Sequence, residues 1–199
     1  KVSSYLVEVY MNTRSYDAAL KSIDRIAKPS AQILEAKQKI LFQLGTQSFA
    51  NADFEQALKY LNQSIAIGQY NRQTKADAYY WCGESYYRLN RMVEAARDFN
   101  AYLQLTTQPN NEMYALANYN LGYIAFHRKD YTQASNYFQK YIQLEKGENA
   151  TALADAYNRI GDCHLHVRNF EEAKQYYSQA EQMNTSSGDY SFYQLALVS

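Results

Sequence analysis

Residues 79–87 read Tyr-Tyr-Trp-Cys-Gly-Glu-Ser-Tyr-Tyr, and this stretch decides the fold. Its glycine is Gly83. Twelve residues later comes Ala95, and four residues beyond that comes Phe99. Two small residues at this separation allow two antiparallel helices to approach closely, and the large residue fills the space between neighbouring hairpins. The stretch therefore predicts a helical hairpin.

The same pattern recurs every 38 or 39 residues along the chain. Its glycines are Gly45, Gly83, Gly122 and Gly161, and the matching alanines are Ala57, Ala95, Ala134 and Ala173. An earlier unit has Val7 in the glycine position and Ala19 in the alanine position. One hairpin cannot bury its own apolar face, so we expect the hairpins to stack as a solenoid.

The pattern predicts one solenoid domain over residues 1–199, with polar breaks between its units. The expected units span approximately residues 1–30, 31–72, 73–111, 112–150 and 151–186. Residues 187–199 are either the first helix of a sixth unit or a helix that covers the fifth. The chain opens at Lys1 without a methionine or an apolar leader, so we expect it to be a piece of a longer protein.

A side chain that suits a helix N-cap precedes most of the predicted second helices. These residues are Ser15, Asp53, Asp130 and Asn169. Their side-chain oxygens are expected to accept hydrogen bonds from free backbone N–H groups of the helix. The third unit has Arg91 in this place, and we expect it to lack the cap.

The composition limits the function classes. Lysine and arginine total 20, as do aspartate and glutamate, so a nucleic-acid-binding role loses its main electrostatic support. No apolar run approaches the roughly 20 residues that cross a bilayer. Tyrosine is unusually frequent, with 21 copies, and its amphipathic ring suits contact surfaces.

These features together resemble the tetratricopeptide repeat. The stretch from Tyr79 to Tyr87 is the best match, and Leu121-Gly122-Tyr123 with Ala134 and Phe138 follows it. The period is longer than the roughly 34 residues of the common form. The resemblance implies an all-α fold, a right-handed superhelical solenoid of antiparallel helix hairpins. The long period and the tyrosines are similar to those of bacterial cell-envelope members of the family, which favours the periplasm or cell envelope over the cytoplasm.

In the family, the first helices of the hairpins line a concave groove that binds a partner. The resemblance places these residues there: Phe42, Phe49, Tyr80, Glu84, Tyr87, Arg88, Tyr119, Tyr123, Phe126, His127, Asn158, Asp162 and His166. We expect most of the tyrosines to be exposed in this groove. The alternative is that some of them pack against the next hairpin. The positions that would hold a carboxylate clamp do not carry its lysine, arginine and asparagine set.

The sequence predicts no catalytic, cofactor or metal site. It has no Gly-x-Ser-x-Gly, phosphate loop or dinucleotide motif. Cys163 and His166 share a helix face, with His127 as their nearest further candidate, but zinc needs at least three convergent protein ligands. His164 occupies a position where a packed aromatic ring is expected, so it is not expected to bind a metal.

We therefore expect a non-catalytic scaffold that binds a peptide or protein segment in a tyrosine-rich groove. Two alternatives stay open. One is a structural module that forms homo-oligomers, and the other is a regulatory module of a larger bacterial envelope or signalling protein. An enzyme is the least favoured class.

Overall fold

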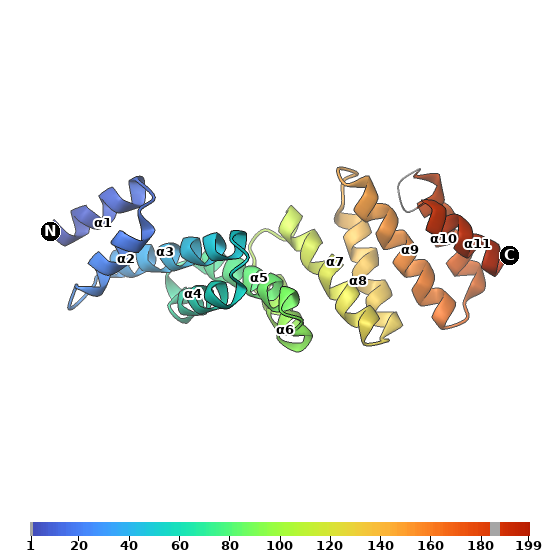
Figure 1. The fold of residues 1–199 in the computed structure, drawn as a ribbon, viewed down its shortest axis with the longest axis horizontal. Coiled ribbons are helices and arrows are strands. Elements are labelled where there is room, and N and C mark those ends of the chain that lie inside the picture. Colours follow the sequence, from blue (N-terminus) through green and yellow to red (C-terminus); the bar gives the residue numbers. More distant parts are fainter. Residues whose placement is uncertain (1, 184–187) are drawn as a thin grey trace. The chain divides into compact units, whose positions relative to one another are not determined.

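The computed structural model describes residues 2–183 and 188–199, with side chains from residue 6 onward. All regular structure in these ranges is helical, as the sequence predicts (Figure 1). The helices are α1 (Val2–Asn12), α2 (Tyr16–Asp24), α3 (Ala31–Ala50), α4 (Phe54–Ala66), the 3₁₀ turn η1 (Gly68–Tyr70), α5 (Arg72–Arg88), α6 (Met92–Leu105), α7 (Glu112–His127), α8 (Tyr131–Leu144), α9 (Ala150–His166), α10 (Phe170–Gln182) and α11 (Gly188–Val198).

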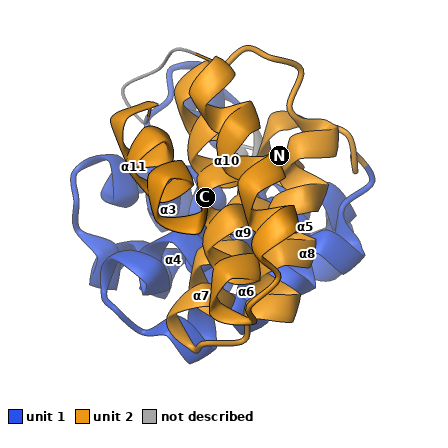
Figure 2. Ribbon diagram, turned by 90° about the vertical axis from the view of Figure 1, so that its right-hand side faces the viewer, with its two compact units in different colours: residues 1–107 blue, residues 108–199 orange. Residues whose placement is uncertain are grey.

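The helices form two compact units, residues 1–107 and residues 108–199, shown in blue and orange in Figure 2. Consecutive helices pair within each unit: α3 packs on α4 and α5 on α6, and α7 packs on α8 and α9 on α10. Within each unit the second helix of one hairpin also contacts the first helix of the next, as α4 does with α5 and α8 with α9. This is the packing expected for stacked helical hairpins. Among the described helices, none is both long and apolar enough to cross a membrane.

In four hairpins a glycine of the first helix lies against a large side chain of the second helix. A Cβ atom added to Gly161 would come within 2.6 Å of the Tyr177 ring, which is fully buried. The same relation holds for the pairs Gly45–Leu61, Gly83–Phe99 and Gly122–Phe138. Only glycine leaves room for a backbone approach this close. The repeated glycine is therefore a packing requirement of the hairpin.

The turn inside each hairpin contains one left-handed residue that is not glycine. These residues are Arg14, Ala52, Asn90, Lys129 and Arg168, with φ between 58° and 64°. In the third hairpin, the backbone N–H of Arg91 donates to the carbonyl of Tyr86 at 2.8 Å. This bond spans the end of the first helix, as in a Schellman C-cap. The turns thus repeat with the same 38- or 39-residue period as the glycines.

The expected second-helix caps form in only two of four places. Asp53 and Asp130 accept from the backbone N–H groups of Gln56 and Gln133, both at 3.2 Å. The prediction is wrong for Ser15 and Asn169, which make no side-chain cap hydrogen bond. The Ser15 hydroxyl instead accepts from the Thr13 hydroxyl at 3.2 Å.

The first helices carry caps that the sequence analysis did not single out. Each capping side chain accepts a hydrogen bond from a backbone N–H three residues later. The capping residues are Ser30, Asn71, Asn111 and Asn149. These caps fix the starts of α3, α5, α7 and α9, the helices that carry the predicted binding residues.

Candidate functional site

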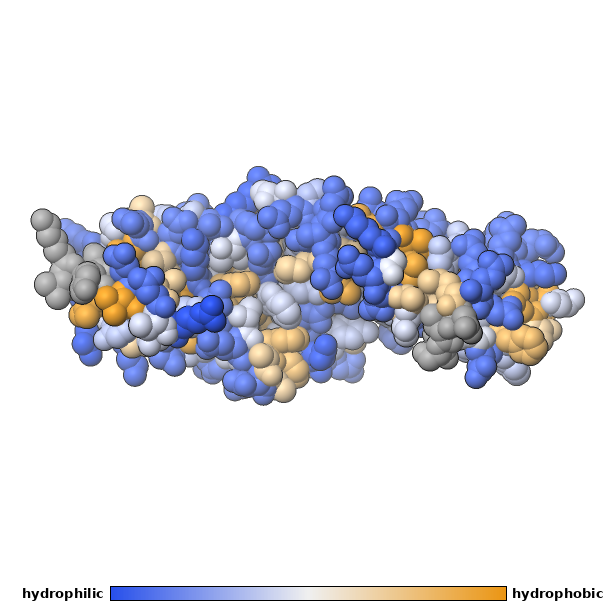
Figure 3. Space-filling model, turned by 90° about the horizontal axis from the view of Figure 1, so that it is seen from above, coloured by the Kyte–Doolittle hydropathy of each residue, from blue (hydrophilic) through white to orange (hydrophobic). Residues whose placement is uncertain are grey.

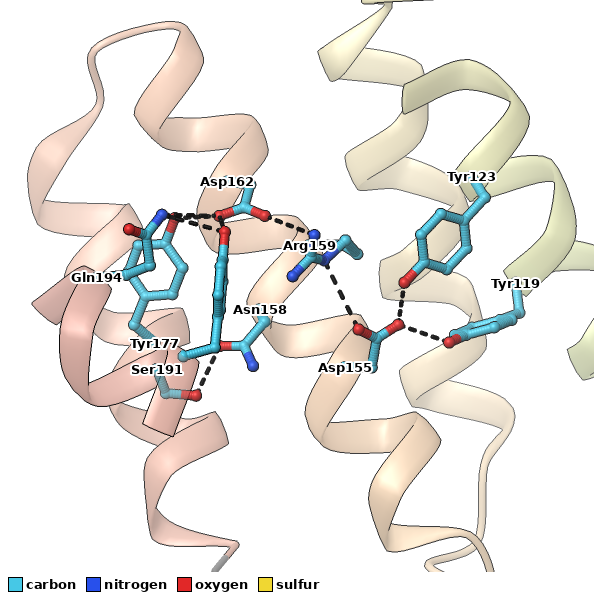
Figure 4. Close-up of polar contacts among 10 residues, drawn as sticks. Tyr119, Tyr123, Asp155, Asn158, Arg159, Asp162, Tyr177, Ser191 and Gln194 are labelled. Carbon is cyan, nitrogen blue, oxygen red and sulfur yellow. Dashed lines mark hydrogen bonds and ion pairs between the residues drawn. The ribbon is translucent and has the colours of Figure 1, made fainter. Parts of the chain in front are cut away.

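A polar cluster in unit 2 joins helix α7 to helix α9. Tyr119 and Tyr123 lie one turn apart on α7, and both hydroxyls donate to the same carboxylate oxygen of Asp155 on α9 (Figure 4). The Tyr119 bond measures 2.6 Å. Both rings remain partly exposed. We call these three residues the tyrosine–aspartate surface.

Arg159 lies between two carboxylates on the same face of α9. Its Nε atom is 3.7 Å from the Asp155 carboxylate, and its Nη1 atom is 3.1 Å from the Asp162 carboxylate. Its guanidinium also stands 4.8 Å from the centre of the Tyr190 ring, a cation–π distance. Burial acts to lower the pKa of Arg159, but the charges of Asp162 and Asp155 outweigh it and raise the pKa. The arginine therefore pairs closely with Asp162 and more distantly with Asp155, toward which its Nε atom makes no hydrogen bond.

The second carboxylate, Asp162, is buried under α10 and α11. Its Oδ1 atom accepts from the hydroxyls of Tyr177 at 2.5 Å and Tyr190 at 2.6 Å, and from the Gln194 amide at 3.3 Å. Figure 4 shows Tyr177 of α10 and Gln194 of α11 converging on Asp162. The three donors satisfy an acceptor that would otherwise be costly to bury.

The tyrosines of the cluster are held as hydrogen-bond donors. Burial, and then the hydrogen bond to Asp155, raises the pKa of Tyr119 and of Tyr123. Burial, and then the bond to Asp162, does the same for Tyr177 and Tyr190. All four hydroxyls therefore keep their protons at neutral pH.

The residues predicted for one groove fall into two sets, six in unit 1 and seven in unit 2. In unit 2, Tyr119, Tyr123 and Phe126 are partly exposed, and His127 and His166 are exposed. In unit 1, Arg88 is exposed, and Phe42, Phe49, Glu84 and Tyr87 are partly exposed.

The remaining three predicted residues are buried, which corrects the expectation that they face a partner. Tyr80, Asn158 and Asp162 are only 3%, 1% and 4% exposed. The Tyr80 ring packs against Phe99 and Tyr102, with ring centres 5.7 and 5.4 Å away. Asn158 and Asp162 lie beneath α11. These three side chains present almost no surface, and the binding role of the other ten stays a prediction.

Two of the histidines of unit 2, His164 and His166, stack on tyrosine rings. The His166 ring stacks on Tyr131 with centres 4.3 Å apart and planes 3° from parallel, and His164 stacks on Tyr176. Cys163 is buried, and burial raises its pKa to about 12. Across residues 2–183 and 188–199, no three His, Cys, Asp or Glu side chains are grouped to hold a metal ion.

Three residues of the cluster were not singled out from the sequence: Arg159, Tyr190 and Gln194. A weak signal for Arg159 exists, because Asp155, Arg159 and Asp162 are spaced by four and three residues and so share a helix face. No local pattern marks Gln194 as part of the cluster, because it also bonds to Asp162 on α9 and Tyr177 on α10.

Comparison with known families agrees with this architecture. Two models of the tetratricopeptide repeat match the chain, one over residues 42–112 and the other over residues 113–186. The chain belongs to the tetratricopeptide repeat family. The two matches together cover well over half of its length, and they include all four hairpin glycines.

Solved structures share the tetratricopeptide fold at low sequence identity. MamA is 19% identical with a TM-score of 0.62, over 95% of this chain and 93% of that one. YrrB, a TPR protein with an unusual peptide-binding site, is 16% identical with a TM-score of 0.62, over 89% and 82%. BtubC from P. vanneervenii is 17% identical with a TM-score of 0.64, over 93% and 80%. No curated protein sequence matches the chain.

Proposed function

We propose that this tetratricopeptide chain is a non-catalytic scaffold, and that a peptide or protein segment binds over its tyrosine–aspartate surface. The observation that carries the proposal is the pair of partly exposed rings, Tyr119 and Tyr123, tied to one carboxylate. The family supports the general role, because its repeats are interaction modules. The peptide-binding site of YrrB supports it as a precedent in a similar fold.

The geometry favours binding because the surface is already ordered. Both hydroxyls bond to Asp155, and the Asp155 carboxylate also lies within ion-pair distance of Arg159. Side chains that are fixed before binding lose less conformational entropy when a partner arrives. Tyrosine and arginine are also the residue types that most often dominate binding energy at interfaces.

The charge of the cluster suggests the chemistry of the partner. Two aspartates face one arginine, and the Asp155 side chain keeps 25% of its surface exposed. Both tyrosine hydroxyls use their protons on Asp155. The groups that are left to contact a partner are the ring carbons and the oxygen atoms, which can accept hydrogen bonds. A segment with apolar side chains and a lysine or arginine would match both properties.

A random peptide library displayed on phage and selected on the purified chain tests the proposal. Selected peptides are then made synthetically, and their affinity is measured by fluorescence anisotropy. We expect Tyr123→Ala to weaken binding at least tenfold and Tyr123→Phe to weaken it less. We also expect Asp155→Asn to weaken the peptides that carry a basic residue.

Val93→Ser is the matched control, because Val93 is an exposed apolar residue of unit 1. Melting curves establish that each variant is folded. Peptides that bind wild type, Tyr123→Ala and Asp155→Asn equally would place the interaction elsewhere and refute the site. The homo-oligomer, the cell-envelope location and the lack of nucleic-acid binding stay predictions.

A further inference from the structure

Two adjoining cavities lie along α8, α9 and α10 of unit 2. Their volumes are about 260 and 250 Å³, and Gln139 of α8 lines both. The Gln139 amide donates to the Ser135 hydroxyl at 2.9 Å, which orients it. His164 of the first cavity stacks on Tyr176 of the second, with ring centres 5.5 Å apart and planes 12° from parallel. The cavities therefore meet at Gln139 and at this ring pair, and we call them together the amide groove.

The amide groove is polar but carries no formal charge from aspartate, glutamate, lysine or arginine. None of the described residues that line it is of these four types, although they make up 20% of the chain. Figure 3 shows that hydrophilic residues cover most of the face of the molecule that it displays. In the groove the hydrophilic groups are neutral hydroxyls and amides, and the amides belong to Asn136, Gln139, Gln143, Asn169 and Gln179.

Several of these neutral groups are available to a ligand. Gln143 and Gln179 are exposed, and Tyr157 and Tyr176 are partly exposed. Within residues 6–183 and 188–199, the two tyrosine hydroxyls and the two side-chain amides make no hydrogen bond to the protein. An amide and a phenol can each donate and accept hydrogen bonds. The second cavity thus offers two aromatic rings and four unused polar groups.

The amide groove lies on the opposite side of α9 from the tyrosine–aspartate surface. Tyr157 and His164 are seven residues apart, close to two full turns, so they share one face of the helix. Asp155 lies nine residues before His164, which is two and a half turns and therefore the other side. The groove is a separate site, and an inference about it does not depend on the function proposed above.

We infer that the amide groove binds a neutral oligosaccharide, with one sugar unit in each cavity. Sugar hydroxyls both donate and accept hydrogen bonds, as the amides and phenols of the groove do. The C–H groups of a sugar ring can pack on the apolar bodies of Tyr157 and Tyr176, which keep their polar tips for hydrogen bonds. Two cavities of nearly equal volume suit a ligand built from like units.

The neutral lining argues against the other ligand classes. A nucleotide or an acidic polysaccharide would find no lysine or arginine among the described lining residues, and a basic peptide would find no carboxylate. Binding sites for charged ligands ordinarily present complementary charge. A few well-placed neutral polar groups beside aromatic rings are typical of a site for an uncharged ligand.

Neutral oligosaccharides of the cellulose, chitin and starch series, each from one to six units long, are the probes. NMR spectra of the isotope-labelled chain detect weak binding and locate it. We expect at least one series to bind saturably and to shift the amide signals of α8, α9 and α10. Affinity should rise at least fivefold from one unit to two and change little beyond two. Gln143→Ala and Tyr176→Ala should each weaken binding at least fivefold.

Gln175→Ala is the matched control, because Gln175 is an exposed glutamine of α10 that lines neither cavity. Melting curves establish that each variant is folded, and Gln143 is exposed, so its replacement should leave the fold unchanged. The acidic polysaccharide heparin should not bind the groove. Failure of all three series to bind would overturn the inference, as would equal binding by wild type, Gln143→Ala and Tyr176→Ala. Library peptides that lose affinity with Gln143→Ala but not with Tyr123→Ala would also overturn it, because the groove would then take a peptide.

Discussion

Gly161 and Tyr177 are packed so tightly that a Cβ atom on the glycine would come within 2.6 Å of the tyrosine ring. The ring is fully buried between α9 and α10, and its hydroxyl donates to Asp162. One tyrosine thus fills the helix contact and also supports the polar cluster. The packing of the repeat and the geometry of the candidate site are therefore coupled in the fifth hairpin.

Gly161→Ala should lower the free energy of unfolding by about 1–3 kcal/mol, because the new methyl group would force the Tyr177 ring to move. Gly188→Ala is the control, since a Cβ atom there would meet no neighbour within 4 Å. Urea denaturation followed by circular dichroism measures both. Equal stability of the two variants would show that α9 and α10 can separate without cost.

Tyr177→Phe should lower the free energy of unfolding by about 1–3 kcal/mol, because it removes a donor from the buried Asp162 carboxylate. Tyr157→Phe is the comparison in the same unit. Tyr157 is a partly exposed tyrosine of α9 whose ring packs on Tyr176. The same urea titration applies. If Tyr177→Phe is as stable as wild type, the remaining donors Tyr190 and Gln194 satisfy Asp162 without it.

Alanine substitution should destabilise a second helix that has a side-chain cap more than one that has none. Asp130→Ala removes an observed cap and should cost about 1 kcal/mol of unfolding free energy. Asn169→Ala should change it far less, because Asn169 makes no side-chain cap bond. Thermal melts of the two variants test the difference. A larger loss for Asn169→Ala would contradict the cap assignment.

Stability should fall in alkaline solution. Burial, and then the bond to Asp162, raises the pKa of Tyr177 from the ordinary value of 10.0. Above that pH the unfolded chain releases the proton while the folded chain keeps it, so the unfolded state binds fewer protons and stability decreases as pH rises. The free energy of unfolding, measured in urea, should therefore decline above about pH 10. In Tyr177→Phe the decline should be shallower, and identical slopes would contradict the pKa shift.

The hairpins could be predicted from sequence because their requirement is local. Gly83, Ala95 and Phe99 lie within seventeen consecutive residues, and the same spacing recurs in the other hairpins. The period alone then locates the helix pairs. The helix caps were less predictable. Ser15 is a suitable N-cap residue, but its hydroxyl accepts a hydrogen bond from the Thr13 hydroxyl and does not cap the helix.

The polar cluster was only partly predictable, because its contacts between helices join residues 15 to 36 positions apart. The repeat places Asp162 on the first helix of its hairpin, but it does not show that Tyr190 and Gln194 of α11 will cover it. Tyr80 is buried by the rings of Phe99 and Tyr102, which pack against it from α6. Whether a side chain such as Asp162 or Tyr80 is buried depends on which residue packs over it from another helix. The position of a residue within the repeat does not determine that neighbour.

The left-handed turn residues allow the rigidity of each hairpin to be changed separately. Because none of Arg14, Ala52, Asn90, Lys129 and Arg168 is glycine, each turn holds a backbone conformation that costs a side-chain-bearing residue roughly 1 kcal/mol or more. Replacing any one of them by glycine would relieve that local strain without touching a helix contact. In the described part of the chain, five equivalent positions can therefore change the rigidity of a single hairpin while the tyrosine–aspartate surface stays intact.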